Sequence, residues 1–289
     1  MILWLLLLAA PLVRCGFEEN QIQMNKMLKG YKRMHRPVKD ERTVTKVAVF
    51  VDISHAERVD EEEQTMLIHG NLYSSWIDEY LTWNETVFNE TEITVDAWKI
   101  WQPALALYNS ARGNYWNLYM NGAPAFIRSN GRVILTGSYS FYVTCKFDFT
   151  DWPFDTQECP VVIADWVYDL SRVNLSDSGP RDFENFGDPD DFKRLKTADE
   201  EDPGKMYSGG WQIVDTWKKH CYWGPRGCRD QQPEGQIEWY WSLLEFGVRF
   251  QRHVPYFGFA VVLPTVGYEL LRVVFLSNQT HNVSLINNS

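Results

Sequence analysis

The stretch CKFDFTDWPFDTQEC, which runs from Cys145 to Cys159, decides the fold. Its two cysteines enclose an alternating run, Phe147-Asp148-Phe149, and a tight tetrapeptide, Trp152-Pro153-Phe154-Asp155. A loop that only connects two strands would be polar, because connecting segments run over the protein surface. A stretch with so many aromatic side chains therefore predicts a loop whose tip presses against another surface.

The composition is that of a globular chain with an unusual aromatic content. The 289 residues are enough for one large or two ordinary domains, and 45% of them are hydrophobic. The 13 Trp, 14 Tyr and 16 Phe are a heavy aromatic load. The 38 acidic residues exceed the 28 Lys and Arg, which argues against a nucleic acid partner, because phosphates need clustered positive charge. An acidic balance is compatible with a cationic ligand, although most surface carboxylates are simply solvated.

The N-terminal residues 1–15 have the pattern of a secretory signal peptide. The run MILWLLLLAAPLV is too short to span a bilayer, and small residues near position 15 allow cleavage there. The alternative is a buried N-terminal helix. Cleavage would remove Cys15 and leave four cysteines in two close pairs, and the oxidising secretory compartment favours disulfides. The four are Cys145, Cys159, Cys221 and Cys228.

Six glycosylation sequons agree with an exported chain. One sequon is common by chance, but several behind a signal peptide indicate glycosylation. We expect modification at Asn84, Asn89 and Asn174. Three more sequons lie after residue 276, at Asn278, Asn282 and Asn287. If the segment before them crosses the membrane from outside to inside, these last three sequons face the cytosol and stay unmodified.

The body of the chain, residues 16–255, has the alternating pattern of β-strands. Many short strands separated by turn residues, with no helices between them, indicate an antiparallel immunoglobulin-like β-sandwich rather than a βαβ fold. A short helix is predicted before the strands, from about Gln21 to Tyr31, with Pro37 beyond its end. The predicted strands lie in Thr45–Ser54, Thr65–Ile77, Gly131–Phe147, Cys159–Leu170 and Ser242–Arg252.

Two other segments have a distinct composition. The acidic stretch from Arg181 to Lys205 predicts a long solvated loop without ordered ligand spacing for a cation. The apolar stretch from Tyr256 to Leu276 has the length of a membrane-spanning helix, although it contains Glu269 and Arg272. These two charges lie three residues apart and could pair. The alternative is a buried or interfacial helix, and a polar tail, residues 277–289, follows.

Several motifs together resemble the Cys-loop family of pentameric ligand-gated receptors. The stretch from Cys145 to Cys159 has the cysteine spacing and the Trp-Pro-Phe-Asp sequence of that family's signature loop. In the family's order, the chain also carries SWIDEYLTWN, IWQPALALYNSA, DWVYD and RFQRHVPYFGFAVVLP, at residues 75–84, 100–111, 165–169 and 249–264. The resemblance implies the extracellular ligand-binding domain of a nicotinic acetylcholine receptor-like subunit, with about ten strands behind an N-terminal helix.

The resemblance gives the Cys145–Cys159 loop a role in coupling. A disulfide that closes about 15 residues contributes about 3 kcal/mol in the chain-entropy model. In the family this loop lies at the membrane end and touches the channel domain. It would pass ligand binding to the pore through Trp152, Pro153, Phe154 and Asp155. The alternative is a disulfide that only stabilises the sandwich.

The resemblance also implies a cage of aromatic rings for a small cationic neurotransmitter, because a quaternary ammonium binds over ring faces. By motif position, Tyr108 and Trp166 belong to two of the loops that form the ligand site, and Trp223 and Trp241 lie near the third. Since Trp166 and Tyr168 alternate, they are predicted to share one strand face, with Asp169 orienting the turn. The alternative for each ring is core packing.

The chain departs from the nicotinic pattern at the third loop. Six residues separate Cys221 from Cys228, where the nicotinic principal subunits carry adjacent cysteines. A disulfide would close a small hairpin here. A zinc site with His220 is the weaker alternative, and we expect no metal or other cofactor. Arg226 at the tip would repel a cation if it faced the pocket. Because the adjacent cysteines are absent, acetylcholine as the ligand is in doubt.

The opposite face of the subunit departs as well. Asn71 stands where the family often has a tryptophan, and Ala104 stands where it has an aspartate. Tyr73 lies two residues after Asn71, so its side chain is expected on the same strand face, where its ring could replace that of the missing tryptophan. We therefore expect the chain to form the principal side of a site between subunits and to assemble with homologous subunits of another kind, as a hetero-pentamer.

Two functions remain open at this point. The first is a subunit on the extracellular side of a postsynaptic or neuronal membrane. Because the sequence shows one candidate membrane segment, it is expected to lack the pore-lining helix and not to conduct ions alone. The second is a secreted or tethered protein that buffers transmitter. An enzyme is not expected, because no Gly-x-Ser-x-Gly, phosphate-binding glycine loop or His-Glu-x-x-His is present.

Overall fold

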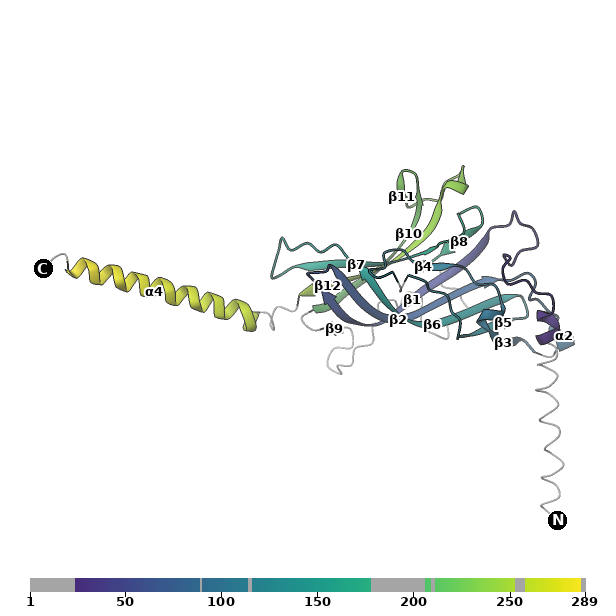
Figure 1. Cartoon of the computed structure of the whole chain (residues 1–289), viewed down its shortest axis with the longest axis horizontal. Helices are drawn as coiled ribbons and strands as arrows, with labels where there is room; N and C mark the ends of the chain where they lie inside the picture. Colours follow the sequence, from purple (N-terminus) through teal and green to yellow (C-terminus); the bar gives the residue numbers. More distant parts are fainter. Residues whose placement is uncertain are drawn as a thin grey trace, which may run out of the picture.

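The computed structural model describes residues 24–88, 90–113, 116–177, 206–208, 211–252 and 258–286, which form two β-sheets and a long C-terminal helix (Figure 1). The expected signal peptide, Asn89 and the acidic stretch 181–205 lie outside these residues. Residues 24–28 are helical, within the helix predicted from the sequence. The short helix α2 (Glu85–Phe88) precedes strand β3 (Glu92–Asp96), and the 3-10 turn η1 (Ala97–Lys99) follows that strand.

The first sheet has six strands in the order β3-β5-β6-β2-β1-β8. Its central strands are long and pair over most of their length, so that Thr65 lies opposite Thr144 and Ile77 opposite Arg132. Every pair is antiparallel except β1 and β8. The strands are β1 (Thr45–Asp60), β2 (Thr65–Ile77), β3 (Glu92–Asp96), β5 (Pro124–Arg128), β6 (Arg132–Thr144) and β8 (Val173–Ser176).

The second sheet follows the order β11-β10-β12-β7-β4, and β9 pairs with β10 outside this path. β12 lies between β10 and β7 and places Cys159 opposite Val248 and Trp223 opposite Trp241. The strands are β4 (Leu105–Leu107), β7 (Thr156–Asp165), β9 (Met206–Ser208), β10 (Trp211–Gly224), β11 (Gly227–Arg229) and β12 (Trp241–Arg252). The 3-10 turn η4 (Ile237–Trp239) precedes β12.

One hydrophobic core joins the two sheets. Along β2, buried residues such as Ile68 and Leu72 alternate with partly exposed ones, because successive side chains of a strand point to opposite faces. The same core cluster contains Val161 from β7 and Phe246 from β12. The antiparallel β-sandwich that the sequence predicts is therefore confirmed, and the described part has twelve strands rather than about ten.

The C-terminal segment is helical beyond the predicted limit. A π-helical turn, η5 (Gly258–Val262), leads into α4 (Leu263–Ile286), which continues past Leu276 into the expected polar tail. Residues Phe259–Leu276 are long and apolar enough to cross a membrane, and none of this window is buried against the rest of the chain. Glu269 and Arg272 form an ion pair at 3.5 Å on the helix surface.

Candidate ligand site and stapled loop

Five aromatic side chains gather where β4, β7, β10 and β12 meet, and we call them the aromatic cluster. Tyr108 and Trp223 have ring centres 6.5 Å apart, and Trp223 and Trp241 have theirs 6.2 Å apart. Trp166 pairs with Trp116 at 6.1 Å. Three of the four rings predicted as ligand-binding thus form a continuous chain, and Trp166 contacts a tryptophan that the sequence interpretation did not include.

The strands hold these rings through the main chain. Tyr108 follows β4, and its N–H donates to the carbonyl of Val162 in β7 at 2.8 Å. The N–H of Leu107 donates to the carbonyl of Trp116 at 2.7 Å, which fixes the segment that carries Trp116. Trp223 and Trp241 are register partners on β10 and β12, and Trp241 packs against the small buried cluster of Ala164, Cys221 and Leu243. The cluster is therefore built on sheet geometry.

Four of the five rings of the cluster are open to solvent. Trp166 is 63% exposed, and Tyr108, Trp116 and Trp223 are exposed too. Large aromatic side chains usually bury 150–250 Å² each and dominate cores and interfaces. The core-packing alternative from the sequence therefore does not describe Tyr108, Trp166 or Trp223, whereas Trp241 is partly buried and packs against a small buried cluster.

Asp165 sets the turn that carries Trp166. This buried carboxylate accepts hydrogen bonds from the N–H groups of Val167 and Tyr168 at 2.9 Å and from that of Ala104 at 3.1 Å. Burial raises the pKa of Asp165, and these hydrogen bonds offset the rise only in part. The carbonyl of Ala104 in turn accepts from the N–H of Trp166 at 3.0 Å. Both main-chain groups of Ala104 thus anchor the turn.

Two predictions about this turn are wrong. Trp166 and Tyr168 do not share a strand face, because β7 ends at Asp165 and Tyr168 packs against the core while Trp166 is exposed. The residue that orients the Trp166 turn is Asp165 rather than Asp169. Asp169 accepts from the N–H of Ser171 at 2.9 Å, one turn later.

The disulfide Cys221–Cys228 joins β10 to β11 and closes a hairpin, with 5.5 Å between its Cα atoms. The turn needs glycine at both ends. Gly227 has a φ of 91°, and a Cβ on Gly224 would lie 2.4 Å from the ring of Tyr240. The tight contact between Gly224 and Tyr240 fixes the hairpin beside the aromatic cluster.

His220 belongs to a polar network at the base of the hairpin. Its Nε2 lies 2.7 Å from Ser242 Oγ, and its ring contacts that of Tyr222, 4.3 Å between centres. Burial lowers the pKa of His220, although Asp177 acts against this. Both neighbouring cysteines are in the disulfide, and the described residues contain no group of three potential metal ligands.

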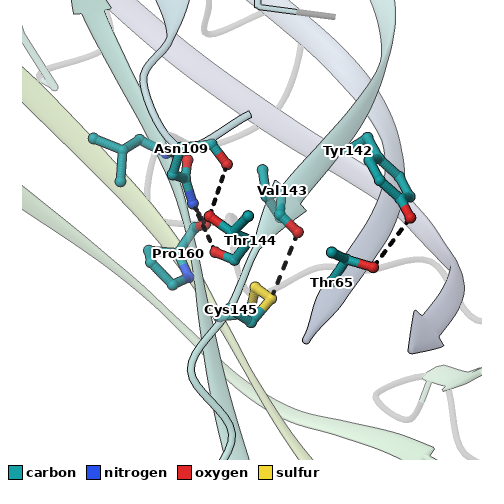
Figure 2. The surroundings of a disulfide bond; sticks show 9 residues. Thr65, Asn109, Tyr142, Val143, Thr144, Cys145 and Pro160 are labelled. Carbon is teal, nitrogen blue, oxygen red and sulfur yellow. Dashed lines mark hydrogen bonds between the residues drawn. A yellow bond between two sulfur atoms is a disulfide. The ribbon is translucent and has the colours of Figure 1, made fainter. Parts of the chain in front are cut away.

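The stapled loop, residues 145–159, is closed by the disulfide Cys145–Cys159, whose Cα atoms are 5.0 Å apart. Asn109 ties the two strands beside it, as Figure 2 shows. Its Nδ2 donates to the carbonyls of Thr144 at 3.1 Å and Pro160 at 2.8 Å, and its Oδ1 accepts from the N–H of Val162 at 3.0 Å. Because Asn109 follows Tyr108, these bonds connect the aromatic cluster to the base of the loop.

The loop presents aromatic residues outward while its base is buried. Phe154 is 64% exposed, and Trp152 is exposed next to a cis bond to Pro153. The main chain inside the loop is hydrogen-bonded, since the N–H of Phe154 donates to the carbonyl of Asp151 at 2.8 Å. Phe147 points inward and contacts Phe250 of β12 edge to face.

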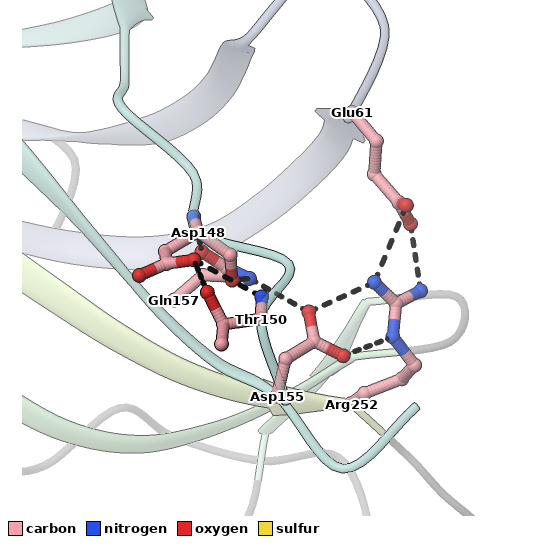
Figure 3. Close-up of polar contacts among 6 residues, drawn as sticks. All are labelled: Glu61, Asp148, Thr150, Asp155, Gln157 and Arg252. Atoms are coloured by element: carbon pink, nitrogen blue, oxygen red, sulfur yellow. Dashed lines mark hydrogen bonds and ion pairs between the residues drawn. The ribbon is translucent and has the colours of Figure 1, made fainter. Parts of the chain in front are cut away.

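Asp155 and Arg252 form a buried ion pair at the base of the loop (Figure 3). Arg252 Nε donates to Asp155 Oδ1 at 2.6 Å and Nη2 donates to Oδ2 at 3.0 Å, while the two side chains are 1% and 4% exposed. Arg252 also donates to both oxygens of Glu61, at 2.8 and 3.2 Å. The guanidinium covers the ring of Trp211, with Cζ 4.2 Å from the ring centre. One arginine thus joins the β1–β2 turn, the stapled loop and the end of β12.

The charges of this pair stabilise each other. Burial alone raises the pKa of Asp155, but hydrogen bonds from Arg252 and Gln157 outweigh it and hold this pKa below its ordinary value. Burial acts to lower the pKa of Arg252, and the bonds to Asp155 and Glu61 reverse this and raise it. Both groups are therefore ionised at neutral pH.

The described glycosylation candidates have different surroundings. Asn84 is exposed, and its Oδ1 accepts from the N–H of Thr86 at 3.0 Å. Asn174 lies in β8, where its Oδ1 accepts from Ser242 Oγ at 3.2 Å. Of the two residues on the opposite face, Asn71 accepts from Ser138 Oγ at 2.7 Å, and the ring of Tyr73 lies 5.9 Å from that of Phe50.

The sequence interpretation missed four residues of these sites, Trp116, Asp165, Arg252 and Glu61. Trp116 stands in the aromatic run NYWNLYM, and Asp165 opens the motif DWVYD, so both had a local signal. Arg252 stands in the motif RFQRHVPYFGFAVVLP, but its pairing with Glu61 had no local signal, because the two residues are 191 positions apart.

Residues 20–221 match the family described as "Neurotransmitter-gated ion-channel ligand binding domain". "Acetylcholine receptor-like protein cup-4" of Caenorhabditis briggsae is 29% identical over 251 residues, which cover 83% of this chain and 54% of that protein. "Neuronal acetylcholine receptor subunit alpha-2" of Gallus gallus is 34% identical over 161 residues, which cover 55% of this chain and 30% of that protein. The match thus spans about half of the nematode relative and about a third of the chicken subunit.

Proposed function

Because the chain belongs to the family of neurotransmitter-gated ion-channel ligand-binding domains, we propose that its aromatic cluster binds a small cationic transmitter at a subunit interface. The family consists of ligand-gated receptors rather than enzymes. The single observation that carries the proposal is the group of exposed rings, held on sheet hydrogen bonds around Trp166 and Trp223.

The chemistry of the rings suits a quaternary ammonium. A cation over the face of a tryptophan gains about 0.5–1 kcal/mol when exposed and about 2 kcal/mol or more when desolvated. The cluster offers two groups of ring contacts, Tyr108–Trp223–Trp241 and Trp116–Trp166. A formal net charge of −10 further attracts cations to the chain.

A second subunit would complete the site. The exposed rings contact a bound ligand on one side only. A second surface has to cover the ligand on its other side to exclude water from the cation. We propose that this surface comes from a homologous receptor subunit. Since Asn71 and Tyr73 stand on the opposite face in place of the usual tryptophan, the partner is of another kind, as in a hetero-pentamer.

Two sets of hydrogen bonds connect the aromatic cluster to the end of the domain next to the membrane-span candidate. Asn109 links the segment after Tyr108 to both strands that leave the stapled loop. Arg252 links that loop to the end of β12, a few residues before η5 and the membrane-span candidate Phe259–Leu276. We propose that ligand binding displaces β7 and β12 together and that Trp152 and Phe154 pass the movement to a membrane-embedded partner surface, with the domain on the extracellular side.

The test compares Trp166→Ala with the matched control Trp239→Ala in the full chain. Trp239 is also exposed but lies outside the ring contacts of the cluster. With tetramethylammonium as the probe in isothermal titration calorimetry, Trp166→Ala should lose about 1–2 kcal/mol of binding free energy, because a cation–π contact is removed. The control should bind like the unaltered chain. Equal affinity of the two variants would remove Trp166 from the site.

A further inference from the structure

A basic pocket lies at the end of the sandwich that carries the helical residues 24–28. It has a volume of about 620 Å³ and is lined by most of the residues between Met27 and Glu41, together with Tyr80, Tyr168 and Arg172. All of these residues are described in the structure. In Figure 1 the α4 helix extends from the opposite end of the sandwich.

The lining of the pocket has the opposite charge to the chain as a whole. Five of its side chains carry a positive charge, and Glu41 is its one carboxylate. The chain has a formal net charge of −10, so this concentration of positive charge is local. The five are Lys29, Lys32, Arg36, Lys39 and Arg172.

Most of these charges are free to meet a ligand. Lys29, Lys32, Lys39 and Arg172 are exposed, and no ion pair joins them to a carboxylate in the part of the chain that the structure describes. Glu79, just outside the pocket lining, accepts from the N–H of Lys39 at 2.7 Å, so it is engaged with the main chain.

Arg36 fixes the shape of the pocket. Its guanidinium donates to the carbonyls of Glu41 at 2.5 Å, Thr43 at 2.7 Å and Arg172 at 2.9 Å. These bonds tie the N-terminal segment to the turn that carries Arg172. They satisfy the donors of Arg36 without a carboxylate, so its positive charge is not neutralised.

We infer that this pocket binds an organic ligand that carries two or more sulfate or phosphate groups. Lys and Arg side chains form strong charge-assisted hydrogen bonds to such oxyanions. Cations from two segments, the lysines at 29, 32 and 39 and the distant Arg172, match more than one anionic group, and the volume lies in the range of small-molecule sites. Tyr80 and Tyr168 supply apolar surface for the scaffold of the ligand. The inference goes beyond the proposed function and does not depend on binding at the aromatic cluster.

Two probes distinguish the source of the anionic groups in a calorimetric titration of the full chain. A fully sulfated heparin-derived hexasaccharide represents a sulfated sugar, and inositol hexakisphosphate represents a small polyphosphate. We expect at least one of them to bind, with an affinity that falls as salt rises from 50 to about 200 mM, because the contact is between charges near the surface. The probe that binds more tightly identifies the source. No binding of either probe at the lower salt concentration would overturn the inference.

Matched variants distinguish binding in this pocket from nonspecific attraction to positive charge anywhere on the surface. Lys29→Gln, Lys32→Gln and Lys39→Gln combined should weaken binding at least about tenfold, because three charge-assisted contacts are lost. Arg172→Gln, in the other segment, should weaken it several-fold. The control Lys146→Gln, Lys218→Gln and Lys219→Gln changes the net charge equally at exposed positions away from the pocket. Equal losses in the two triple variants would overturn the inference.

Discussion

The base of the stapled loop and the aromatic cluster are built in opposite ways. At the loop, charged groups are buried and paired, as Asp155 and Arg252 show, and a disulfide closes the chain. At the cluster, apolar rings are exposed, and the order comes from main-chain hydrogen bonds such as those of Asp165. The first arrangement locks three segments together, whereas the second leaves ring faces open for a ligand.

The difference has an energetic reason. Removing one partner of a buried ion pair leaves an uncompensated charge, so the pair ties its segments firmly. An exposed ring contributes little to folding and keeps its face available to a cation. The predictions below therefore separate changes that unfold the loop base from changes that affect the cluster.

The largest expected effect comes from Arg252→Ala. It leaves Asp155 buried without its cation, and the free energy of unfolding should fall by about 3–5 kcal/mol. Arg249→Ala is the control, since Arg249 forms exposed pairs with Glu158 and Asp215 and should lose at most about 1 kcal/mol. Chemical denaturation of both variants measures the two losses. Similar losses would mean that the buried pair does not hold the loop base.

Asp165→Asn should have an intermediate effect. The amide keeps the shape of the carboxylate but turns an NH2 group toward main-chain N–H donors that need an acceptor. The expected loss of stability is about 1–3 kcal/mol.

Binding of tetramethylammonium should weaken in the same variant, because the turn that carries Trp166 loses its anchor. Asp169→Asn serves as the control at the next turn. If the Asp165 variant unfolds more easily but binds with unchanged affinity, Asp165 does not position the ring.

The smallest expected effect is a pH dependence from His220. Burial lowers its pKa in the folded state, so the unfolded chain binds more protons at mildly acidic pH. The contribution to stability is present above the unfolded pKa of about 6.5 and is lost as the pH falls through the lower folded value.

His220→Gln should flatten this part of the curve when the melting temperature is measured from pH 7.5 to about 5. Asp177 acts against the shift, and the ring centre of Tyr222 lies 4.3 Å from that of His220. A variant that follows the same curve as the unaltered chain would assign the acid sensitivity to another group.

The strands with clear alternation could be predicted from the sequence, and the irregular ones could not. β2 spans Thr65–Ile77, as its alternating pattern indicates. β10 was missed because a register shift between Ile213 and Asp215 breaks its alternation and charged residues such as Lys218 interrupt it.

The candidate site also contains some residues that could be predicted from the sequence and others that could not. Tyr108 and Trp223 follow from motif order, and the structure brings them together. The Arg252 network could not be predicted, because it joins segments that are 97 and 191 residues apart. Asp165 acts through main-chain groups, whose positions depend on where β7 ends.

The measurement that tests the central claim most directly is a fluorination series at Trp166. Fluorine withdraws electron density from the ring face with little change in size, so it weakens a cation–π contact. The affinity of tetramethylammonium for the full chain should fall with each added fluorine at Trp166 and stay constant for the same series at Trp239. Constant affinity through the series at Trp166 would contradict binding of a cation over this ring.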